Sequence, residues 1–276
     1  MYSIQWFPGH MKKTLQEIKN NLQLVNFVLI ILDSRIPFSS INWELLKILN
    51  NKPFLFLLNK STLADHIQNQ PFLAFLQKKK FPYLNIDAKY NHKINLILPY
   101  IKKILRYQYK INYKVLKLMI VGVPNVGKST LINKLKRKKT MMIANSPGVT
   151  KKLQWIKLST DVKLVDTPGI LYPKIVNSFV GYSLALCSCI KESLLPLTEL
   201  LEYLLIYFRD YYPKYLKILF NLTQEEIQHK NLFFIIRQKT NILTEEQMFF
   251  SILNQIKKGK IKNINFDLNL KFLLTQ

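Results

Sequence analysis

The sequence predicts an α/β fold built around a phosphate-binding loop, followed by a smaller all-α C-terminal domain. Short apolar runs alternate with helical patterns over the first 175 residues, a glycine-rich loop follows one of these runs, and the strand pattern ends after residue 174. Strands that alternate with helices form layered sheets whose ligands bind at the carboxyl ends of the strands. We therefore expect two domains, residues 1–175 and 176–276.

The expected elements follow one another along the chain. Apolar runs predict strands, and an apolar repeat of three to four residues predicts helices. Strands are expected at 27–32, 53–58, 83–86, 115–121, 153–158 and 162–165, and helices at 10–24, 42–50, 71–80, 93–107 and 128–137. Four or five amphipathic helices are expected from 176 to about 256, with breaks near Pro196, Pro213 and Asn221. Thr223 and Thr244, each followed by glutamates, predict helix starts.

The segment Gly122-Val-Pro-Asn-Val-Gly-Lys-Ser-Thr130 has the spacing of a phosphate-binding loop and follows an expected strand. Its two glycines let the backbone fold around phosphate oxygens so that N–H groups point inward. The helix start adds a positive dipole end, Lys128 adds a charge, and Ser129 offers a hydroxyl to Mg²⁺. The sequence therefore predicts a nucleoside triphosphate site. Its phosphate contacts are expected from Pro124, Asn125, Val126, Gly127, Lys128, Ser129 and Thr130.

A second motif, Val162-Lys-Leu-Val-Asp166-Thr-Pro-Gly169, is a short apolar strand that ends in an aspartate and a turn. Such an aspartate holds the Mg²⁺ shell, and Gly169 lets the backbone approach a γ-phosphate. The intervening Ser146-Pro-Gly-Val-Thr150 offers a threonine to the metal in the triphosphate state. Asp-Thr-Pro-Gly is typical of GTPases, in which it forms the second switch. The expected Mg²⁺ ligands are Ser129, Thr150 and Asp166.

The motif expected to read guanine lies upstream of the phosphate-binding loop. GTPases use Asn-Lys-x-Asp, and the candidate here is Asn59-Lys60-Ser-Thr62, at the end of the expected strand 53–58. The next strand runs into Asp87-Ala88-Lys89, which resembles the Ser-Ala-Lys loop that supports the base. This order of motifs predicts a circularly permuted GTPase sheet. Such a permutation requires little structural change, because domain termini usually lie close together at the surface.

One position departs from the guanine motif. Thr62 stands where an aspartate accepts hydrogen bonds from guanine N1–H and the exocyclic amine. A hydroxyl does not replace a bidentate carboxylate, and the lost charged hydrogen bonds are worth about 1.5–3 kcal/mol. Asp65, three residues further on, is one candidate substitute. Guanine specificity is therefore expected to be weakened or rebuilt.

Over residues 4–192 the chain resembles the bacterial circularly permuted GTPases of the ribosome biogenesis GTPase A (YlqF) family. The similar stretches are Gln5-Trp-Phe-Pro-Gly-His10-Met11, Asp33-Ser-Arg-Ile-Pro-Phe-Ser-Ser-Ile-Asn42 and Asp166-Thr-Pro-Gly-Ile-Leu-Tyr-Pro-Lys174. The resemblance implies that this chain has the same permuted fold and the same GTPase activity.

The resemblance also implies roles for single residues. Ile170 stands where many GTPases orient the attacking water with a glutamine, which isoleucine cannot do. His10 is implied to be catalytic instead, and Asn125 to coordinate a K⁺ ion that bridges the phosphates. The expected catalytic residues are His10, Lys128 and Thr150. Two alternatives stay open, namely His10 as a packing or RNA-contacting residue and Asn125 as a simple loop residue.

Composition points to a polyanionic partner. The formal net charge is +25, from 41 Lys and Arg against 16 Asp and Glu. Such an excess favours nucleic acid binding, although a strongly AT-biased genome would also enrich lysine. The basic runs at 78–80, 134–139 and 257–262 are candidate RNA contacts or plain solvated faces. Cys187 and Cys189 lie in an apolar stretch and are expected in the core, as in a reducing cytosol.

The function that this resemblance implies is GTP hydrolysis by a factor that binds the precursor of the large ribosomal subunit and its rRNA. The helical domain would contact rRNA, and hydrolysis would release the factor. The alternative is a nucleotide-gated RNA-binding scaffold with negligible hydrolysis. No signal-peptide pattern or bilayer-length apolar run is present, so we expect a cytoplasmic monomer without a membrane partner.

Overall fold

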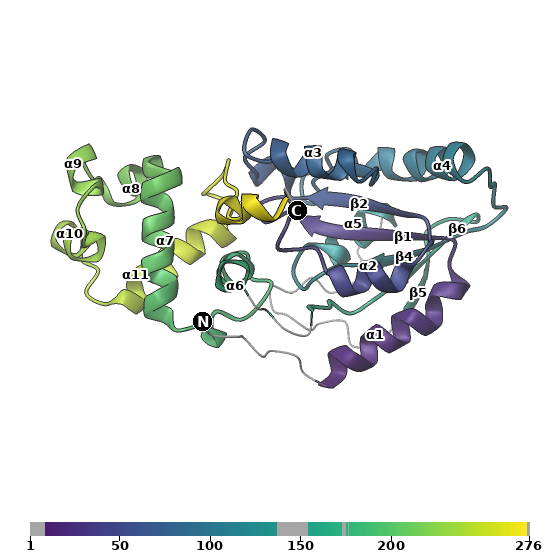
Figure 1. The fold of residues 1–276 in the computed structure, drawn as a ribbon, viewed down its shortest axis with the longest axis horizontal. Coiled ribbons are helices and arrows are strands. Elements are labelled where there is room, and N and C mark those ends of the chain that lie inside the picture. The colour runs from purple at the N-terminus through teal and green to yellow at the C-terminus, as the bar shows by residue number, and fades with distance from the viewer. Residues whose placement is uncertain (1–8, 137–153, 173–174, 176, 275–276) are drawn as a thin grey trace.

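The computed structural model describes residues 9–136, 154–172, 175 and 177–274. A mixed sheet with helices packed on both faces forms one part of the molecule, and a group of helices near the C-terminus forms the other (Figure 1). Both parts have the element types that the sequence predicts. The domain boundary after residue 175 remains a prediction.

Among the described residues, six strands make up the sheet, in the order β3-β2-β1-β4-β6-β5. They are β1 (Phe27–Asp33), β2 (Phe54–Asn59), β3 (Tyr83–Asn85), β4 (Leu116–Val121), β5 (Gln154–Lys157) and β6 (Val162–Asp166). All neighbours are parallel except β5 and β6, which are antiparallel. The register pairs Asp33 with Asn59 and Ile120 with Asp166. Because parallel strands end at the same edge, the predicted motifs meet along one side of the sheet.

The α-helices of the sheet region begin and end within a few residues of the predicted bounds. They are α1 (Gly9–Asn21), α2 (Trp43–Leu49), α3 (Gln70–Lys78), α4 (Ile97–Gln108) and α5 (Lys128–Leu135). The short 3₁₀ helices η1 (Leu22–Leu24) and η3 (Ile94–Leu96) lie inside predicted helices, whereas η2 (Ser61–Leu63) was not predicted. Asn42 starts α2, because its side chain accepts a hydrogen bond from the Leu45 N–H.

The C-terminal region contains six α-helices rather than the four or five expected. They are α6 (Ser178–Leu186), α7 (Leu197–Tyr211), α8 (Pro213–Phe220), α9 (Gln224–Ile227), α10 (Leu232–Lys239) and α11 (Glu245–Lys257), with η4 (Glu192–Leu194) and η5 (Leu268–Leu274). The four residues of α9 are too few to give an apolar repeat. Thr223 and Thr244 do begin helices as predicted, and each forms a capping box, with Glu226 and Gln247 respectively.

Side chains of β1 alternate between two apolar cores, one on each face of the sheet. Phe27, Leu29 and Ile31 lie in one core, and Val28, Ile30 and Leu32 lie in the other. The first core includes buried residues of α4, α5 and α6 and continues into the C-terminal helices, whereas the second includes residues of α1, α2 and α3. Burial on both faces explains why β1 is apolar throughout instead of alternating.

The chain returns to the sheet region before it ends. Phe266 N–H donates to the Arg35 carbonyl at 2.7 Å. The Asp267 carboxylate accepts from the Phe38 and Ser39 N–H groups at 2.9 Å each. The hydroxyls of Tyr207, Tyr212 and Tyr215 bind the backbone of this segment at Asn265, Leu268 and Lys262. The last segment thereby joins the helical region to the loop after β1.

Within the described residues, no helix has both the length and the apolar character needed to cross a bilayer.

Candidate nucleotide-binding site

The phosphate-binding loop connects β4 to α5 and is packed tightly on its base-binding side. Gly127 has φ +100, and a Cβ added there would lie 2.3 Å from Asn59 Nδ2. A Cβ at Gly122 would lie 2.5 Å from the Ile31 carbonyl oxygen. Both positions therefore need glycine for close approach, and Gly127 needs it also for its left-handed backbone.

Lys128 begins α5 and is buried inside the loop. Its ammonium donates to the carbonyls of Gly122 at 3.0 Å and Val123 at 2.9 Å. Burial lowers the pKa of Lys128 to about 8, although the nearby Asp166 carboxylate acts in the opposite direction. The side chain thus keeps most of its positive charge at neutral pH, at the centre of the loop.

Asp166 ends β6 and is fully buried, and Ser129 is partly buried in the first turn of α5. The carboxylate oxygens of Asp166 and the hydroxyl oxygen of Ser129 are ligand types that suit Mg²⁺. Thr150, the third predicted ligand, lies outside the described residues. Among the residues that are described, no group of three or more His, Cys, Asp or Glu side chains could hold a metal.

The turn after β6 lies against the phosphate-binding loop. A Cβ at Gly169 would meet the Pro124 Cα at 2.8 Å, so the two backbones are in contact. Ile170 is buried in the core, its N–H donates to the Gly122 carbonyl, and its carbonyl accepts from Asn42 Nδ2. Ile170 therefore joins the turn to the loop through its backbone, while its side chain is buried in the core. His10 lies in α1, but its side chain is outside the part of the chain that the structure describes.

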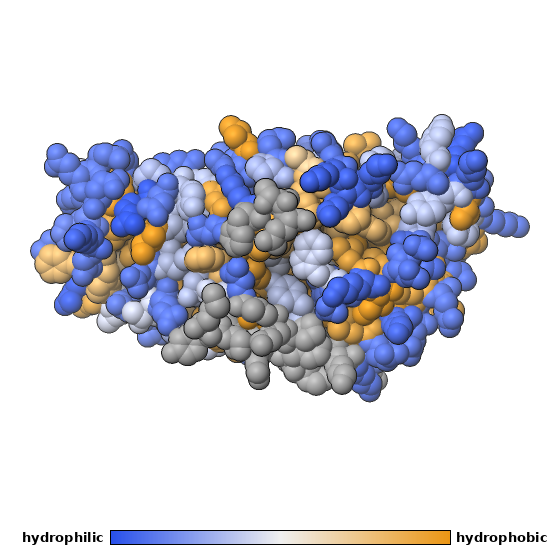
Figure 2. Space-filling view, viewed as in Figure 1, coloured by the Kyte–Doolittle hydropathy of each residue, from blue (hydrophilic) through white to orange (hydrophobic). Residues whose placement is uncertain are grey.

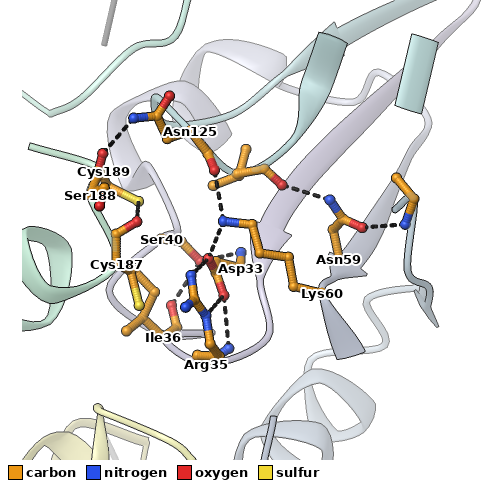
Figure 3. A network of polar contacts seen from close by, with 12 residues as sticks. Asp33, Arg35, Ile36, Ser40, Asn59, Lys60, Asn125, Cys187, Ser188 and Cys189 are labelled. Atoms are coloured by element: carbon orange, nitrogen blue, oxygen red, sulfur yellow. Dashed lines mark hydrogen bonds and ion pairs between the residues drawn. The ribbon is translucent and has the colours of Figure 1, made fainter. Parts of the chain in front are cut away.

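Two side chains of the predicted guanine motif connect the loops after β2 and β3 to the phosphate-binding loop (Figure 3). Asn59 Nδ2 donates to the Val126 carbonyl at 2.7 Å, and Asn59 Oδ1 accepts from the Ala88 N–H at 2.9 Å. Lys60 Nζ donates to the Asn125 carbonyl at 2.8 Å. The structure thus brings together residues that the sequence placed in three separate motifs.

The buried Asp33 carboxylate forms ion pairs with both Lys60 and Arg35. Asp33 receives Lys60 Nζ at 2.7 Å and the Arg35 guanidinium at 2.7 and 3.0 Å (Figure 3). Burial alone would raise the pKa of Asp33, but its two cationic partners hold the pKa well below the usual range. The sequence patterns gave neither Asp33 nor Arg35 a place in the site. The available signal was an acidic residue at the end of an apolar strand, as at Asp166.

The phosphate-binding loop also contacts the segment that follows α6. Asn125 has φ +60, and its Nδ2 donates to the Ser188 carbonyl at 2.7 Å. Ser188 lies between Cys187 and Cys189, whose free thiols are buried as predicted (Figure 3). Burial raises the pKa of both thiols, which keeps them protonated and apolar. The loop is therefore coupled directly to the first C-terminal helix.

The loops after β2 and β3, predicted to bind the base, contain an unexpected pair. Thr62 Oγ1 donates to Asp87 Oδ2 at 2.5 Å. Asp65, the candidate substitute, faces elsewhere, because Oδ1 accepts from the N–H groups of Ile67 and Gln68 at 3.0 Å each. Its Oδ2 accepts from the Tyr212 hydroxyl at 3.3 Å. Asp65 thus stabilises its own turn and binds the helical region.

Comparison with known proteins agrees with this geometry. A family model described as "50S ribosome-binding GTPase" matches residues 117–262. Ribosome biogenesis GTPase A of Bacillus licheniformis is 39% identical over 232 residues, which cover 81% of this chain and 82% of that protein. Ribosome biogenesis GTPase A of Bacillus cereus is 34% identical, covering 96% of this chain and 93% of that protein. The "Probable ribosome biogenesis GTPase A" of Mycoplasma pneumoniae is 33% identical, covering 96% of this chain and 97% of that protein.

A crystal structure of GNP-bound YlqF from T. maritima has the same fold, with a TM-score of 0.59 at 23% identity over 92% of this chain and 97% of that one. The permuted order of motifs in this chain is consistent with that fold. The predicted fold class is thereby confirmed. With its phosphate-binding loop, its second switch and these relatives, the chain belongs to the ribosome biogenesis GTPase A family and is a GTPase.

Proposed function

We propose that GTP binds along the edge of the sheet where β2, β3, β4 and β6 end. The phosphates would be held by Pro124, Asn125, Val126, Gly127, Lys128, Ser129, Thr130, Asp166 and Gly169. The base would lie against Asn59, Lys60, Asp87, Ala88 and Lys89. The observation that carries this proposal is the Asn59 side chain, which binds the Val126 carbonyl and the Ala88 N–H at the same time. It fixes the phosphate and base loops at one separation.

We propose further that Ser129, Asp166 and Thr150 hold Mg²⁺ and that Asn125 contributes to a K⁺ site. When bound, Mg²⁺ would neutralise charge that develops between the β- and γ-phosphates. Lys128 would supply a second positive charge from inside the loop. Because Ile170 is buried, the group that orients water must come from another element, and His10 on α1 is our candidate.

The proposed partner is the precursor of the large ribosomal subunit, bound through rRNA in the cytoplasm by a monomer. Support comes from the net charge of +25 and from the names of the relatives. Hydrophilic side chains cover much of the face in Figure 2. Lys78, Lys79, Lys80, Lys257, Lys258, Lys260 and Lys262 are all exposed. Such lysines suit phosphate contacts that do not depend on base sequence.

Turnover and sedimentation test this function together. We expect large-subunit precursors to increase the rate of GTP hydrolysis, and the protein to co-sediment with them more strongly with a non-hydrolysable GTP analogue than with GDP. Asp166→Asn is the matched control, because it keeps the shape of the side chain but weakens a metal ligand. Nucleotide-dependent co-sedimentation without any stimulated turnover would favour the scaffold alternative.

A further inference from the structure

The two side chains of the Thr62–Asp87 pair differ in solvent exposure, which matters for base recognition. Thr62 is exposed at the end of the guanine motif, whereas Asp87 is only 1% exposed behind it. Of the two side chains, the threonine is therefore the one open to contact with a ligand. The carboxylate, at 2.5 Å from the threonine hydroxyl, acts on the ligand through it.

The hydrogen bonds of Asp87 fix the direction of the Thr62 hydroxyl. Asp87 Oδ1 accepts from the N–H groups of Lys89 at 2.9 Å and Tyr90 at 3.2 Å. Oδ2 faces Thr62, and an ionised carboxylate can only accept. Since a threonine hydroxyl has a single hydrogen, that hydrogen is committed to Asp87. The lone pairs of Thr62 Oγ1 remain for another donor.

We infer that Thr62 and Asp87 together replace the guanine-reading aspartate. Thr62 Oγ1 accepts a hydrogen bond from guanine, and Asp87 is a positioning residue that keeps the hydroxyl hydrogen away from the base. This inference rests on the proposed nucleotide site. In this chain the loop after β2 has a hydroxyl, that of Thr62, where the usual motif has a carboxylate. The carboxylate lies instead in the loop after β3, on Asp87.

The arrangement discriminates between bases through hydrogen-bond polarity. Guanine presents N1–H and an exocyclic amine, which are donors, whereas adenine presents N1 as an acceptor. A free hydroxyl could satisfy either base by rotating. A hydroxyl locked as an acceptor pairs with guanine and faces the adenine N1 lone pair with another lone pair. Asp87 thereby converts an unselective group into a guanine-selective one.

Affinities for GTP, ATP and XTP, measured by calorimetry on the full chain, test the inference. Thr62→Val removes the acceptor at nearly constant shape and should lower the GTP-to-ATP affinity ratio about tenfold, the usual worth of a net hydrogen bond or slightly more. Thr62→Ser keeps the hydroxyl and should retain the ratio. In Asp87→Asn, the N–H groups of Lys89 and Tyr90 require the amide oxygen, so Nδ2 faces Thr62 and donates to it.

The Thr62 hydrogen then turns toward the base in Asp87→Asn, and the ratio should again fall about tenfold, although Thr62 itself is unchanged. Melting curves check that each variant is folded. If Asp87→Asn does not fold, the comparison of Thr62→Val with Thr62→Ser still tests the inference, because Thr62 is exposed. An unchanged ratio in Thr62→Val overturns the inference. An unchanged ratio in a folded Asp87→Asn variant also overturns it, because Asp87 would then not set the direction of the Thr62 hydroxyl.

Nucleotide affinities of the unsubstituted protein distinguish a failure of this inference from a failure of the proposed site. Equal affinity for GTP and ATP would contradict only the reading of guanine by the pair. Absence of binding to either nucleotide would contradict the proposed site as a whole.

Discussion

The proposed phosphate site takes its groups mainly from one continuous segment, whereas the proposed base site takes its groups from two loops, after β2 and after β3. In the first, backbone N–H groups and the charge of Lys128 are proposed to bind phosphate, and Gly127 lies against Asn59 in a backbone conformation that only glycine adopts easily. In the second, side chains from different strands meet, as Thr62 and Asp87 do.

This difference explains why one motif is intact and the other is altered. A loop that binds through its own backbone cannot exchange the glycines that set its path, here Gly122 and Gly127. A pair of side chains can exchange partners between two strands, provided that one hydroxyl and one carboxylate remain in contact. The phosphate side should therefore tolerate few substitutions, whereas the base side should tolerate compensated ones.

Lys128→Ala should have the largest effect. The variant loses charge-assisted hydrogen bonds to phosphate, worth about 1.5–3 kcal/mol each, so GTP affinity should fall at least about a hundredfold. The fold should survive, because the Lys128 ammonium binds only loop carbonyls among the described contacts. Calorimetric titration measures the loss, and circular dichroism checks the fold. Unchanged affinity would contradict the assignment of the loop.

Gly127→Ala should come next. The new Cβ would stand 2.3 Å from Asn59 Nδ2 and would disrupt its bond to the Val126 carbonyl. We expect GTP affinity to fall by at least about thirtyfold, from lost hydrogen bonds and a left-handed strain of about 1–2 kcal/mol. Gly259→Ala is the matched control, because φ there is +71 but the neighbour is the flexible Leu63 side chain. It should lower the melting temperature and leave GTP affinity unchanged.

Local patterns in the sequence were sufficient for most of the fold. The six strands and the helices of the sheet region lie close to their predicted ranges, because apolar periodicity and turn residues are local signals. The return of residues 262–268 to the sheet region was not predicted. Its contacts join tyrosines of α7 and α8 to backbone groups some fifty residues away, and such contacts leave no local pattern.

The candidate site shows the same limit. The phosphate-binding loop and Asp166 could be found from spacing alone, since each binds through one contiguous segment. The Asp33–Arg35–Lys60 network could not, because its members come from the ends of two strands that are neighbours only in the folded sheet. The partnership of Thr62 with Asp87 is hidden for the same reason.

A pH dependence should follow from the buried Lys128. Its pKa in the free protein is about 8, and a bound triphosphate anion would raise that pKa. Binding then takes up a proton above pH 8, so GTP affinity should be constant below that pH and fall toward about tenfold per pH unit above it. Titrations between about pH 7 and pH 9 would show the bend. Lys128→Arg, which stays charged, should show no bend over this range, and a bend in both proteins would assign the proton to another group.

The smallest and most specific effect concerns exchange within the base-binding pair. Thr62→Asp alone recreates the usual motif in sequence, but it places a second carboxylate against Asp87. The two like charges repel, so the GTP-to-ATP affinity ratio should change by less than about threefold. Thr62→Asp combined with Asp87→Ser restores one carboxylate and one hydroxyl in exchanged positions. This double variant should exceed the Thr62→Asp single variant several-fold in that ratio, roughly 0.5–1.5 kcal/mol of coupling. The single variant Asp87→Ser completes the cycle. If the four proteins give additive changes, Thr62 and Asp87 act independently on the base, and the base side would be no more tolerant of exchange than the phosphate side.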